Sequence, residues 1–266
     1  MLFATLTVTF LILWALVYAM RPAIRGVRQI LDRLIVHSER ATRYKNYLPV
    51  LAILVAGALL AAWAGDGFMD LAESVRAKSI VLQQSDTLVH DWAIGERTNG
   101  ATFFFTTVTN IGSPAGVTVV LAIVVIVLAV GRRWRWILYL IVTAGGGWLL
   151  ENELKRYFAR ARPAVAEMLR HANGYSFPSG HAMGSAVACG ALAYLAFRSI
   201  KSWPLAAAVI AFLYTFVLAV ALSSVYLGVH WISDVVAGVT AGTVWVTTTT
   251  VAYETMRRIR SARSQT

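Results

Sequence analysis

The sequence predicts an all-α protein built as a polytopic bundle of membrane-spanning helices, and three observations carry this prediction. Hydrophobic residues make up 58% of the 266 residues and charged residues only 14%, whereas soluble domains average about 25% charged residues. Seven stretches are long and apolar enough, or nearly so, to cross a bilayer, which takes about 20 residues. Basic residues collect on one side of these stretches. The composition also excludes a disordered chain, and the single cysteine, Cys189, excludes an internal disulfide.

The predicted spans follow one another as roughly 2–20, 48–64, 114–131, 136–153, 181–197, 204–222 and 232–252. The first stretch has no basic segment before it and no clear small-residue cleavage site, so we interpret it as a retained helix and not as a signal peptide. The sequence Gly112-Ser113-Pro114 is a helix break directly before the third span. Gly145, Gly146 and Gly147 lie inside the fourth span and are typical of close helix packing.

The basic residues set the expected orientation. If the seven spans alternate, 16 of the 24 basic residues share one side, which the positive-inside rule makes cytoplasmic, with the N-terminus outside. They are Arg21, Arg25, Arg28, Arg33, Arg40, Arg43, Lys45, Arg132, Arg133, Arg135, Arg198, Lys201, Arg257, Arg258, Arg260 and Arg263. Topology therefore accounts for much of the net charge of +11, and no nucleic-acid partner is expected.

Two segments outside the spans leave alternatives open. Segment 21–45 spaces apolar residues at helical intervals among arginines, which predicts an amphipathic helix on the inner membrane surface; a solvated linker is the alternative. Segment 65–112 is mixed in composition and predicts short helices over the outer mouth of the bundle. Within it, Phe103, Phe104 and Phe105 either pack at the lipid interface or line an opening for a lipid chain. We expect residues 1–47 to form an N-terminal region and residues 48–266 the core.

The outer loop that starts at Lys155 runs against the positive-inside trend. It gathers five strong cations, Lys155, Arg156, Arg160, Arg162 and Arg170, with Glu167 as its one acidic residue up to Pro178. Such a cluster either extends to lipid phosphates or binds an anion.

Three groups of polar residues fall at the outer ends of predicted spans, and the alternating topology brings them to one depth of the membrane. They are Lys155-x6-Arg162-Pro163, Pro178-Ser179-Gly180-His181 and Ser223-Ser224-x5-His230-x3-Asp234.

His230 and Asp234 are four residues apart, a spacing that places them on one face of a helix. A carboxylate beside one imidazole nitrogen fixes the tautomer and makes the other nitrogen more basic, which prepares a nucleophile or a general base. A buried His–Asp pair with a purely structural role is the alternative. Ionisable residues within a membrane are costly and are functional candidates by default.

His181 opens the fifth span directly after Ser179 and Gly180. The N-terminus of a helix offers free N–H groups and a positive dipole end, which favour an anion. His181 would then stand beside the bound anion, placed to protonate a leaving oxygen, while Lys155 and Arg162 supply positive charge. We expect no metal, because the cations would repel one and no second carboxylate is evident nearby.

These three groups resemble the signature motifs of the type 2 phosphatidic acid phosphatase and haloperoxidase superfamily. The resemblance covers residues 155–234, and the flanking spans resemble the six-helix core of its membrane lipid-phosphatase branch, to which the first span is an N-terminal addition. It implies a phosphatase that needs no metal or other cofactor and works through a phosphohistidine. His230 would attack phosphorus, Asp234 would orient it, and His181 would protonate the leaving group. The phosphoryl oxygens would be held by Lys155, Arg162, Ser179 and Gly180.

One position departs from the family pattern. The third motif of the family has arginine directly after its serine, and here that residue is Ser224. Three outcomes are open: Arg160 or Arg156 replaces the missing phosphate contact, the substrate needs less charge, or the protein binds a lipid phosphate without turning it over. We favour replacement, with Arg160 added to the phosphate-binding residues, because the other motif residues are all present.

The functional hypothesis is a hydrolase of the inner membrane that removes phosphate from a lipid phosphate or diphosphate at a site facing the periplasm. Undecaprenyl diphosphate is the leading substrate, because an outward site suits the recycling of that carrier, and a lipid like phosphatidic acid is the alternative. A non-catalytic protein that binds or transports lipid phosphates is the competing class. The sequence leaves the oligomeric state open.

Overall fold

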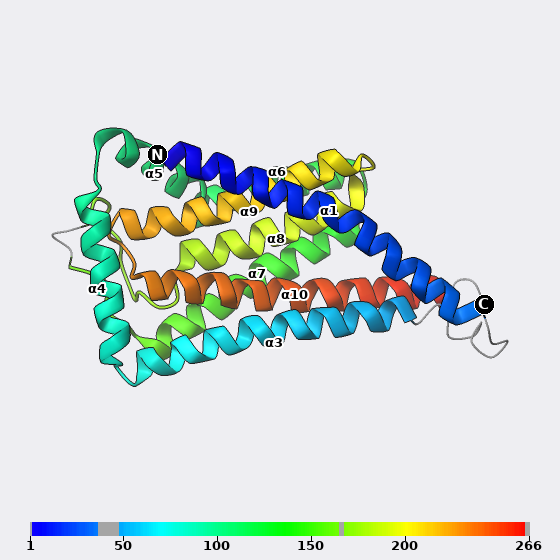
Figure 1. Ribbon diagram of the computed structural model, residues 1–266, viewed down its shortest axis with the longest axis horizontal. Helices are drawn as coiled ribbons and strands as arrows, with labels where there is room; N and C mark the ends of the chain where they lie inside the picture. Colours follow the sequence, from blue (N-terminus) through cyan, green and yellow to red (C-terminus); the bar gives the residue numbers. More distant parts are fainter. Residues whose placement is uncertain (1, 37–47, 165–167, 264–266) are drawn as a thin grey trace.

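The computed structural model describes residues 2–36, 48–164 and 168–263, and every regular element within these ranges is an α-helix. The helices are α1 (Leu2–Val36), α3 (Leu48–Arg76), α4 (Ile80–Gly95), α5 (Asn99–Ile111), α6 (Pro114–Val130), α7 (Trp134–Phe158), α8 (Gly180–Ser199), α9 (Trp203–Tyr226) and α10 (Ile232–Arg263). Figure 1 shows the long helices running along a common direction, with α4 lying across one end of the bundle. The predicted all-α bundle is confirmed.

Each of the seven predicted spans lies within one helix, but the count of seven stays a prediction. Among the described residues, four helices are long and apolar enough to cross a membrane: Leu54–Arg76 of α3, α8, α9 and Ile232–Ser261 of α10. A fifth span results if α5 and α6, which meet at an angle of 53°, are taken together. The fourth predicted span lies in α7, which does not reach the required hydropathy.

The corner between α5 and α6 is the predicted break at Gly112-Ser113-Pro114. Ser113 caps α6 by accepting a hydrogen bond from Gly116 N–H at 3.1 Å, and Pro114 occupies the first turn, where its missing N–H costs nothing. Gly112 lies against α9, where an added β-carbon would overlap Val220. The break therefore comes from local sequence and is held by tertiary packing.

The N-terminal helix is longer than the first predicted span. Residues 2–36 form one helix with Pro22 inside it, so the described part of the predicted surface helix continues the first span. Helix α1 packs along α9, and Trp203 Nε1 donates to Tyr18 O at 3.1 Å. Residues 37–45 and the boundary expected at residue 47 lie outside the described residues, and the placement of this segment on a membrane surface stays a prediction.

The core is the close contact between α8 and α10, and it sets the position of the second and third motifs. Helix α8 is rich in Ala, Gly and Ser, and most of its residues are buried. On α10, a β-carbon at Gly238 would lie 2.6 Å from Ser179 O, and one at Gly242 would lie 2.9 Å from Ala186 Cβ. Small residues let the two backbones approach. Ser179 N–H accordingly donates to Asp234 O at 2.9 Å, which joins the starts of the two helices.

The segment 65–112 forms the two short helices that the sequence predicts, but it begins with the last turns of the long helix α3, and its place on the outer side of the membrane stays a prediction. Helix α3 extends to Arg76, and α4 and α5 follow as short helices over the end of the bundle where α8 and α10 begin (Figure 1). Of the three phenylalanines, Phe103 is exposed, whereas Phe105 is buried and packs on Tyr226 with ring centroids 4.5 Å apart. Phe105 therefore serves packing, while Phe103 is left free at the surface.

Candidate functional site

His230 and Asp234 meet where α9 is followed by α10. His230 lies in the turn before α10 and is 1% exposed, and Asp234 lies in the first turn of α10 and is fully buried. The imidazole Nδ1 faces Asp234 Oδ2 at 3.6 Å. The sequence argument placed both residues on one helical face, but the pairing comes from the turn itself. There the Trp231 N–H donates to Asp234 Oδ2 at 3.0 Å and fixes the carboxylate.

Ser176 completes this pair, although sequence reasoning missed it. It comes from the loop before α8 and is fully buried. Its hydroxyl donates to Asp234 Oδ2 and lies 3.4 Å from His230 Nδ1. A hydroxyl that donates to a carboxylate keeps its lone pairs for an N–H donor. Ser176 therefore connects the imidazole to the carboxylate.

The contact with Arg162 assigns the tautomer of His230. Arg162 Nη1 lies 3.1 Å from His230 Nε2, and a guanidinium only donates hydrogen bonds. Nε2 must therefore be the acceptor, so the proton of the neutral ring sits on Nδ1, toward Ser176 and Asp234. Arg162 is itself held by donation to backbone carbonyls, among them Val229 O at 2.7 Å and Gly174 O at 3.0 Å. The lone pair on Nε2 is the one a nucleophile needs.

Burial determines the charge of His230. Desolvation lowers the pKa of His230 below its usual range, and the positive charges of Arg162 and Lys155 act in the same direction. Asp234 acts against them and holds the pKa up. The net direction is downward, so the ring is neutral at pH 7 and its Nε2 carries an unprotonated lone pair, which accepts from Arg162 in this structure.

Arg160, which the sequence analysis added to the phosphate-binding residues, contacts the other carboxylate oxygen of Asp234. Its guanidinium donates to Asp234 Oδ1 at 2.6 Å and to Asp86 Oδ2 at 2.6 Å. Asp86, from α4, also accepts from the N–H and hydroxyl of Ser233 at 3.0 and 2.7 Å. Arg160 Nη1 is thus bound to Asp234 and Arg160 Nη2 to Asp86. The geometry therefore disfavours Arg160 as the replacement for the missing arginine and makes it a positioning residue that locks α4 to α10.

The change Arg160→Ala is expected to destabilise the protein strongly. It leaves Asp86 and Asp234, both buried, without their cation, and breaking a buried pair costs about 3–5 kcal/mol. Arg156→Ala is the matched control, since Arg156 pairs with Glu153 at 2.6 Å but both side chains are about 70% exposed, a pair worth at most about 1 kcal/mol. Thermal unfolding in detergent measures both variants. Equal stability of the two would contradict the buried clamp.

The start of α8 brings Ser179, Gly180 and His181 up to the end of α7. Ser179 caps the helix, with its side chain accepting from Ala182 N–H at 3.5 Å. A β-carbon at Gly180 would lie 2.8 Å from Lys155 Nζ and would overlap the Glu151 carboxylate, so a larger residue here would displace the ends of these two side chains. Lys155 and Glu151 are 2.9 Å apart. The first and second motifs thus meet at a helix N-terminus, as the sequence predicts.

His181 lies within this cluster of positive charge. Its ring is within electrostatic range of His230, Arg170, Lys155 and Arg162, and its buried Nε2 has no hydrogen-bond partner in the part of the chain that the structure describes. A buried polar atom without a partner is uncommon and calls for an explanation. The two imidazoles and the cations of the first motif therefore share one neighbourhood, as predicted.

Arg170 is a further cation of this cluster that the sequence argument did not place in the site. The preceding residue, Leu169, donates its N–H to Leu227 O at 3.0 Å. This bond ties the loop that contains Arg170 to the end of α9, one helical turn after Ser224. The Nη1 of Arg170 is buried and has no partner among the described residues. Ser224 is fully buried, and its hydroxyl donates to Val220 O within its own helix. Ser224 thus adds no cation, and Arg170 has a guanidinium nitrogen to spare beside His181.

Within residues 2–36, 48–164 and 168–263, no three His, Cys, Asp or Glu side chains come together in a way that would hold a metal ion. The carboxylate nearest His230 is already engaged by Ser176 and Arg160. A metal-independent reaction stays a prediction from the motifs. The chemistry present in the site is a neutral imidazole whose unprotonated Nε2 accepts from Arg162, a second imidazole and several cations.

Comparison with known proteins shows which class of protein this chain resembles. Residues 135–258 match the profile of the PAP2 superfamily. A curated relative, phosphatidylglycerophosphatase B of Bacillus subtilis (strain 168), is 29% identical over 187 residues, which cover 66% of this chain and 85% of the relative. The match spans 124 of the 266 residues, so the chain resembles the PAP2 superfamily over just under half of its length, and this relative is a phosphatase.

Solved structures agree with this resemblance. The crystal structure of a transmembrane PAP2-type phosphatidylglycerolphosphate phosphatase from Bacillus subtilis superposes with a TM-score of 0.67 at 25% identity, covering 73% of this chain and 96% of that one. The structure of Aquifex aeolicus LpxE superposes with a TM-score of 0.51 at 23% identity, covering 62% and 93% of the two chains, and supports the fold alone. The chain is thus a multi-pass membrane protein with the transmembrane PAP2 fold.

Proposed function

We propose that the protein removes a phosphate group from a lipid phosphate or diphosphate, with His230 as the nucleophile. One observation carries the lipid part of this proposal. An apolar groove of about 480 Å³ runs between α6, α7 and α8 and ends at Glu151 and Gly180, beside Lys155. A phosphate bound at the start of α8 would therefore place its lipid chain in this groove.

The groove is open because small residues line it. Gly145 on α7 and Gly184 on α8 both line the groove, and an added β-carbon would meet nothing within 4 Å at either position. Gly147 also lines the groove, and both it and Gly146 pack against Trp245, as the expectation of close helix packing requires, whereas Gly145 does not meet that expectation. The remaining lining is aliphatic or aromatic apart from Thr118 and Glu151. Such a surface suits an acyl or prenyl chain and gives little to a water-soluble phosphate.

The first half of the proposed reaction transfers the phosphoryl group to the enzyme. His230 Nε2 attacks phosphorus while the bond from phosphorus to the leaving oxygen breaks, and protonated His181 gives its proton to that oxygen. The proton on Nδ1 stays on the ring, held toward Ser176 and Asp234, so Asp234 stabilises the charged ring of the phosphohistidine. The phosphoryl oxygens are bound by Lys155, Arg162, Ser179 and the Gly180 N–H, and Arg170 takes the place of the missing family arginine.

The second half returns the enzyme to its starting state. Neutral His181 takes a proton from a water molecule, the water oxygen attacks phosphorus, and the N–P bond breaks to release inorganic phosphate and the free Nε2 lone pair. The same group thus acts first as an acid and then as a base. No oxidant, reductant or further cofactor enters this balance.

Substituting within the groove is the experiment that tests the lipid substrate. Gly184→Leu is expected to raise the KM for a long-chain lipid phosphate by about tenfold or more, while turnover of a short-chain, water-soluble analogue stays within about twofold. The matched control is Gly67→Leu on α3, also in open space and outside the groove. Equal loss on both substrates, or no loss on either, would contradict the groove as the site of the lipid chain.

The particular lipid is the finer part of the proposal. We propose undecaprenyl diphosphate first and a lipid like phosphatidic acid second, at a periplasm-facing site of the inner membrane; the names of the relatives add phosphatidylglycerol phosphate as a third candidate. Phosphate release from purified protein with these three lipids ranks them by kcat/KM. Binding of all three without phosphate release would support the competing function, a protein that binds or transports lipid phosphates.

The pH dependence follows from the lowered pKa of His230. Attack requires the neutral ring, so activity is present above the folded pKa and is lost as the pH falls through it. Because that pKa lies below the usual value of about 6.5, we expect the loss of kcat/KM on the acid side to lie below pH 6.5, after correction for the ionisation of the substrate phosphate. Any loss at higher pH reports the deprotonation of His181, which the mechanism uses as the acid. A nucleophile titrating above pH 6.5 would contradict a neutral, buried His230.

A further inference from the structure

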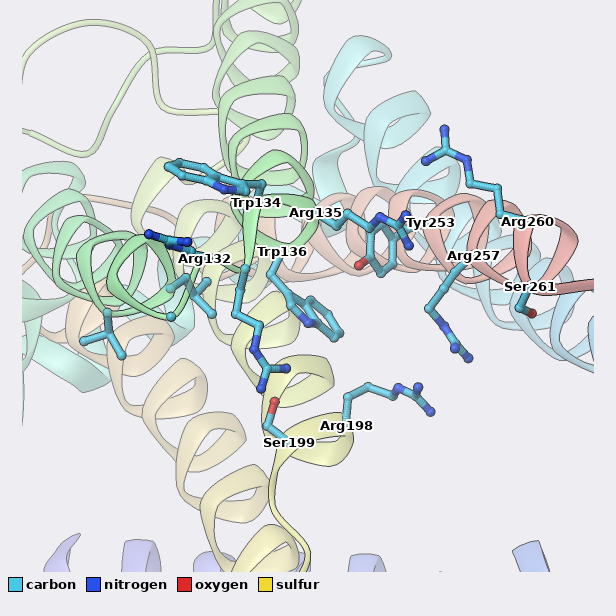
Figure 2. Close-up of a pocket in the computed structure, with 14 residues that line it drawn as sticks. Arg132, Trp134, Arg135, Trp136, Arg198, Ser199, Tyr253, Arg257, Arg260 and Ser261 are labelled. Carbon is cyan, nitrogen blue, oxygen red and sulfur yellow. The ribbon is translucent and has the colours of Figure 1, made fainter. Parts of the chain in front are cut away.

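A second positively charged hollow lies at the opposite end of the bundle from His230. It has a volume of about 1010 Å³ and is formed by the turn between α6 and α7 and by the ends of α8 and α10. Figure 2 shows arginine and aromatic side chains from these elements around a common space. Six arginines line it: Arg132, Arg133, Arg135, Arg198, Arg257 and Arg260. They come from segments that are far apart in sequence, so the fold creates this concentration of charge.

Very little negative charge compensates the arginines of this arginine hollow. None of its lining residues is acidic. Glu254, which lies close by, bonds to Arg257 at 2.6 Å and to Arg258 at 2.6 Å and also accepts from the Tyr194 hydroxyl. In the part of the chain that the structure describes, Arg257 is the one lining arginine with a carboxylate partner. Like charges held this close repel one another, and an anion would relieve the repulsion.

Aromatic rings form one wall of the hollow and give it an apolar side. Trp136 and Tyr253 line it with ring centroids 5.2 Å apart, and Tyr139 and Tyr194 pack behind them. Val127 and Leu128, from the lipid-facing helix α6, line the hollow as well. Arginines beside aromatic rings and aliphatic residues match a phospholipid, whose phosphates lie next to apolar chains. A free phosphate would use the cations alone.

We infer that the arginine hollow binds the headgroup of an anionic phospholipid from the leaflet on that side of the membrane. Topological bias explains why basic residues occur at this end, but it requires neither their convergence on one hollow nor the aromatic wall. The site is separate from the candidate active site and does not depend on the proposed phosphatase function. Its ligand acts as a bound structural or regulatory lipid and is not hydrolysed there.

Cardiolipin, with two phosphodiesters and no terminal phosphate, is the probe for the arginine hollow. Native mass spectrometry of the full-length protein in detergent, titrated with cardiolipin, counts bound lipids. Each surface arginine contributes about fivefold to affinity for an anionic lipid, so Arg132→Gln with Arg198→Gln should weaken the tightest site about 25-fold. The matched control, Lys201→Gln with Arg156→Gln, removes the same charge at exposed positions outside the hollow and should bind like the wild type.

Two outcomes would overturn the inference. Equal weakening in the control double variant would show general attraction to positive charge in place of a defined site. Displacement of cardiolipin by an equal concentration of glycerol 3-phosphate, which has the charge but no chains, would show a site for free phosphate. Intact phosphate release in the double variant would separate the hollow from the active site, and thermal unfolding would confirm that the variant is folded.

Discussion

Replacing His230 by alanine is expected to reduce phosphate release from a lipid phosphate by at least about 10⁴-fold. The reason is that His230 Nε2 carries an unprotonated lone pair whose direction is fixed by its neighbours, since Arg162 donates to it and the ring proton is held toward Ser176. Loss of a covalent nucleophile leaves only binding and electrostatic stabilisation. The measurement is inorganic phosphate released per enzyme, with the substrate that wild type turns over best.

The control variants separate chemistry from folding. His230 is buried, so His230→Gln keeps a polar side chain of similar size while removing the nucleophile, and it should be as inactive as alanine. His171→Ala removes an exposed histidine of the neighbouring loop and should keep wild-type activity. If His230→Gln is folded by thermal unfolding and still releases phosphate at the wild-type rate, His230 is not the nucleophile.

The change Arg170→Ala is expected to lower kcat/KM by about 10²–10³, as removal of one donor to a transferring group does. The structure motivates this prediction because Arg170 is within range of His181 and has a buried Nη1 without a partner among the described residues. Arg170→Lys keeps the charge but not the planar fork, so we expect partial activity. Phosphate release and unfolding temperature are measured together, since the proposal predicts lost activity with little lost stability.

Introducing the family's arginine at position 224 tests whether Arg170 or Arg160 takes its place. Ser224→Arg should restore part of the activity of Arg170→Ala, because it returns a guanidinium to the place that Arg170 is proposed to fill. It should not restore Arg160→Ala, whose defect is a broken clamp on Asp86 and Asp234. Wild-type kcat/KM in Arg170→Ala would remove Arg170 from the site, and rescue of Arg160→Ala would return the role to Arg160.

Much of the fold was predictable because a bilayer constrains sequence strongly. Each apolar stretch became a helix, the break at Gly112-Ser113-Pro114 became a corner, and the arginines of three separate segments came together at one end. The number of spans was less accessible, since α6 is only 17 residues long and counts as a span only with α5. The length of α1 was missed because the apolar stretch ends near residue 20 and the arginine-rich segment after it was predicted as a separate surface helix, whereas residues 2–36 form one helix.

The site was predictable where it consists of motifs and not where it consists of loops. The approach of Lys155, His181 and His230 followed from helix order. Ser176 and Asp86 gave no such signal, because each acts through a contact across long sequence separation, to Asp234 and to Ser233. The sequence argument named Arg160 or Arg156 as the replacement cation and gave Arg170, from the same loop as Arg160, no role in the site. Only the contacts in the structure distinguish Arg160 from Arg170. Two carboxylates bind Arg160, whereas Nη1 of Arg170 has no partner among the described residues.

The central claim, that His230 Nε2 takes the phosphoryl group, is tested most directly by trapping the intermediate. Wild-type protein is mixed with lipid phosphate, quenched in alkali, where phosphohistidine survives, and digested for peptide mass spectrometry. The account predicts one phosphate on the peptide that contains His230, absent from His230→Gln. Phosphate on another residue, or its appearance on the same peptide of His230→Gln, would contradict it.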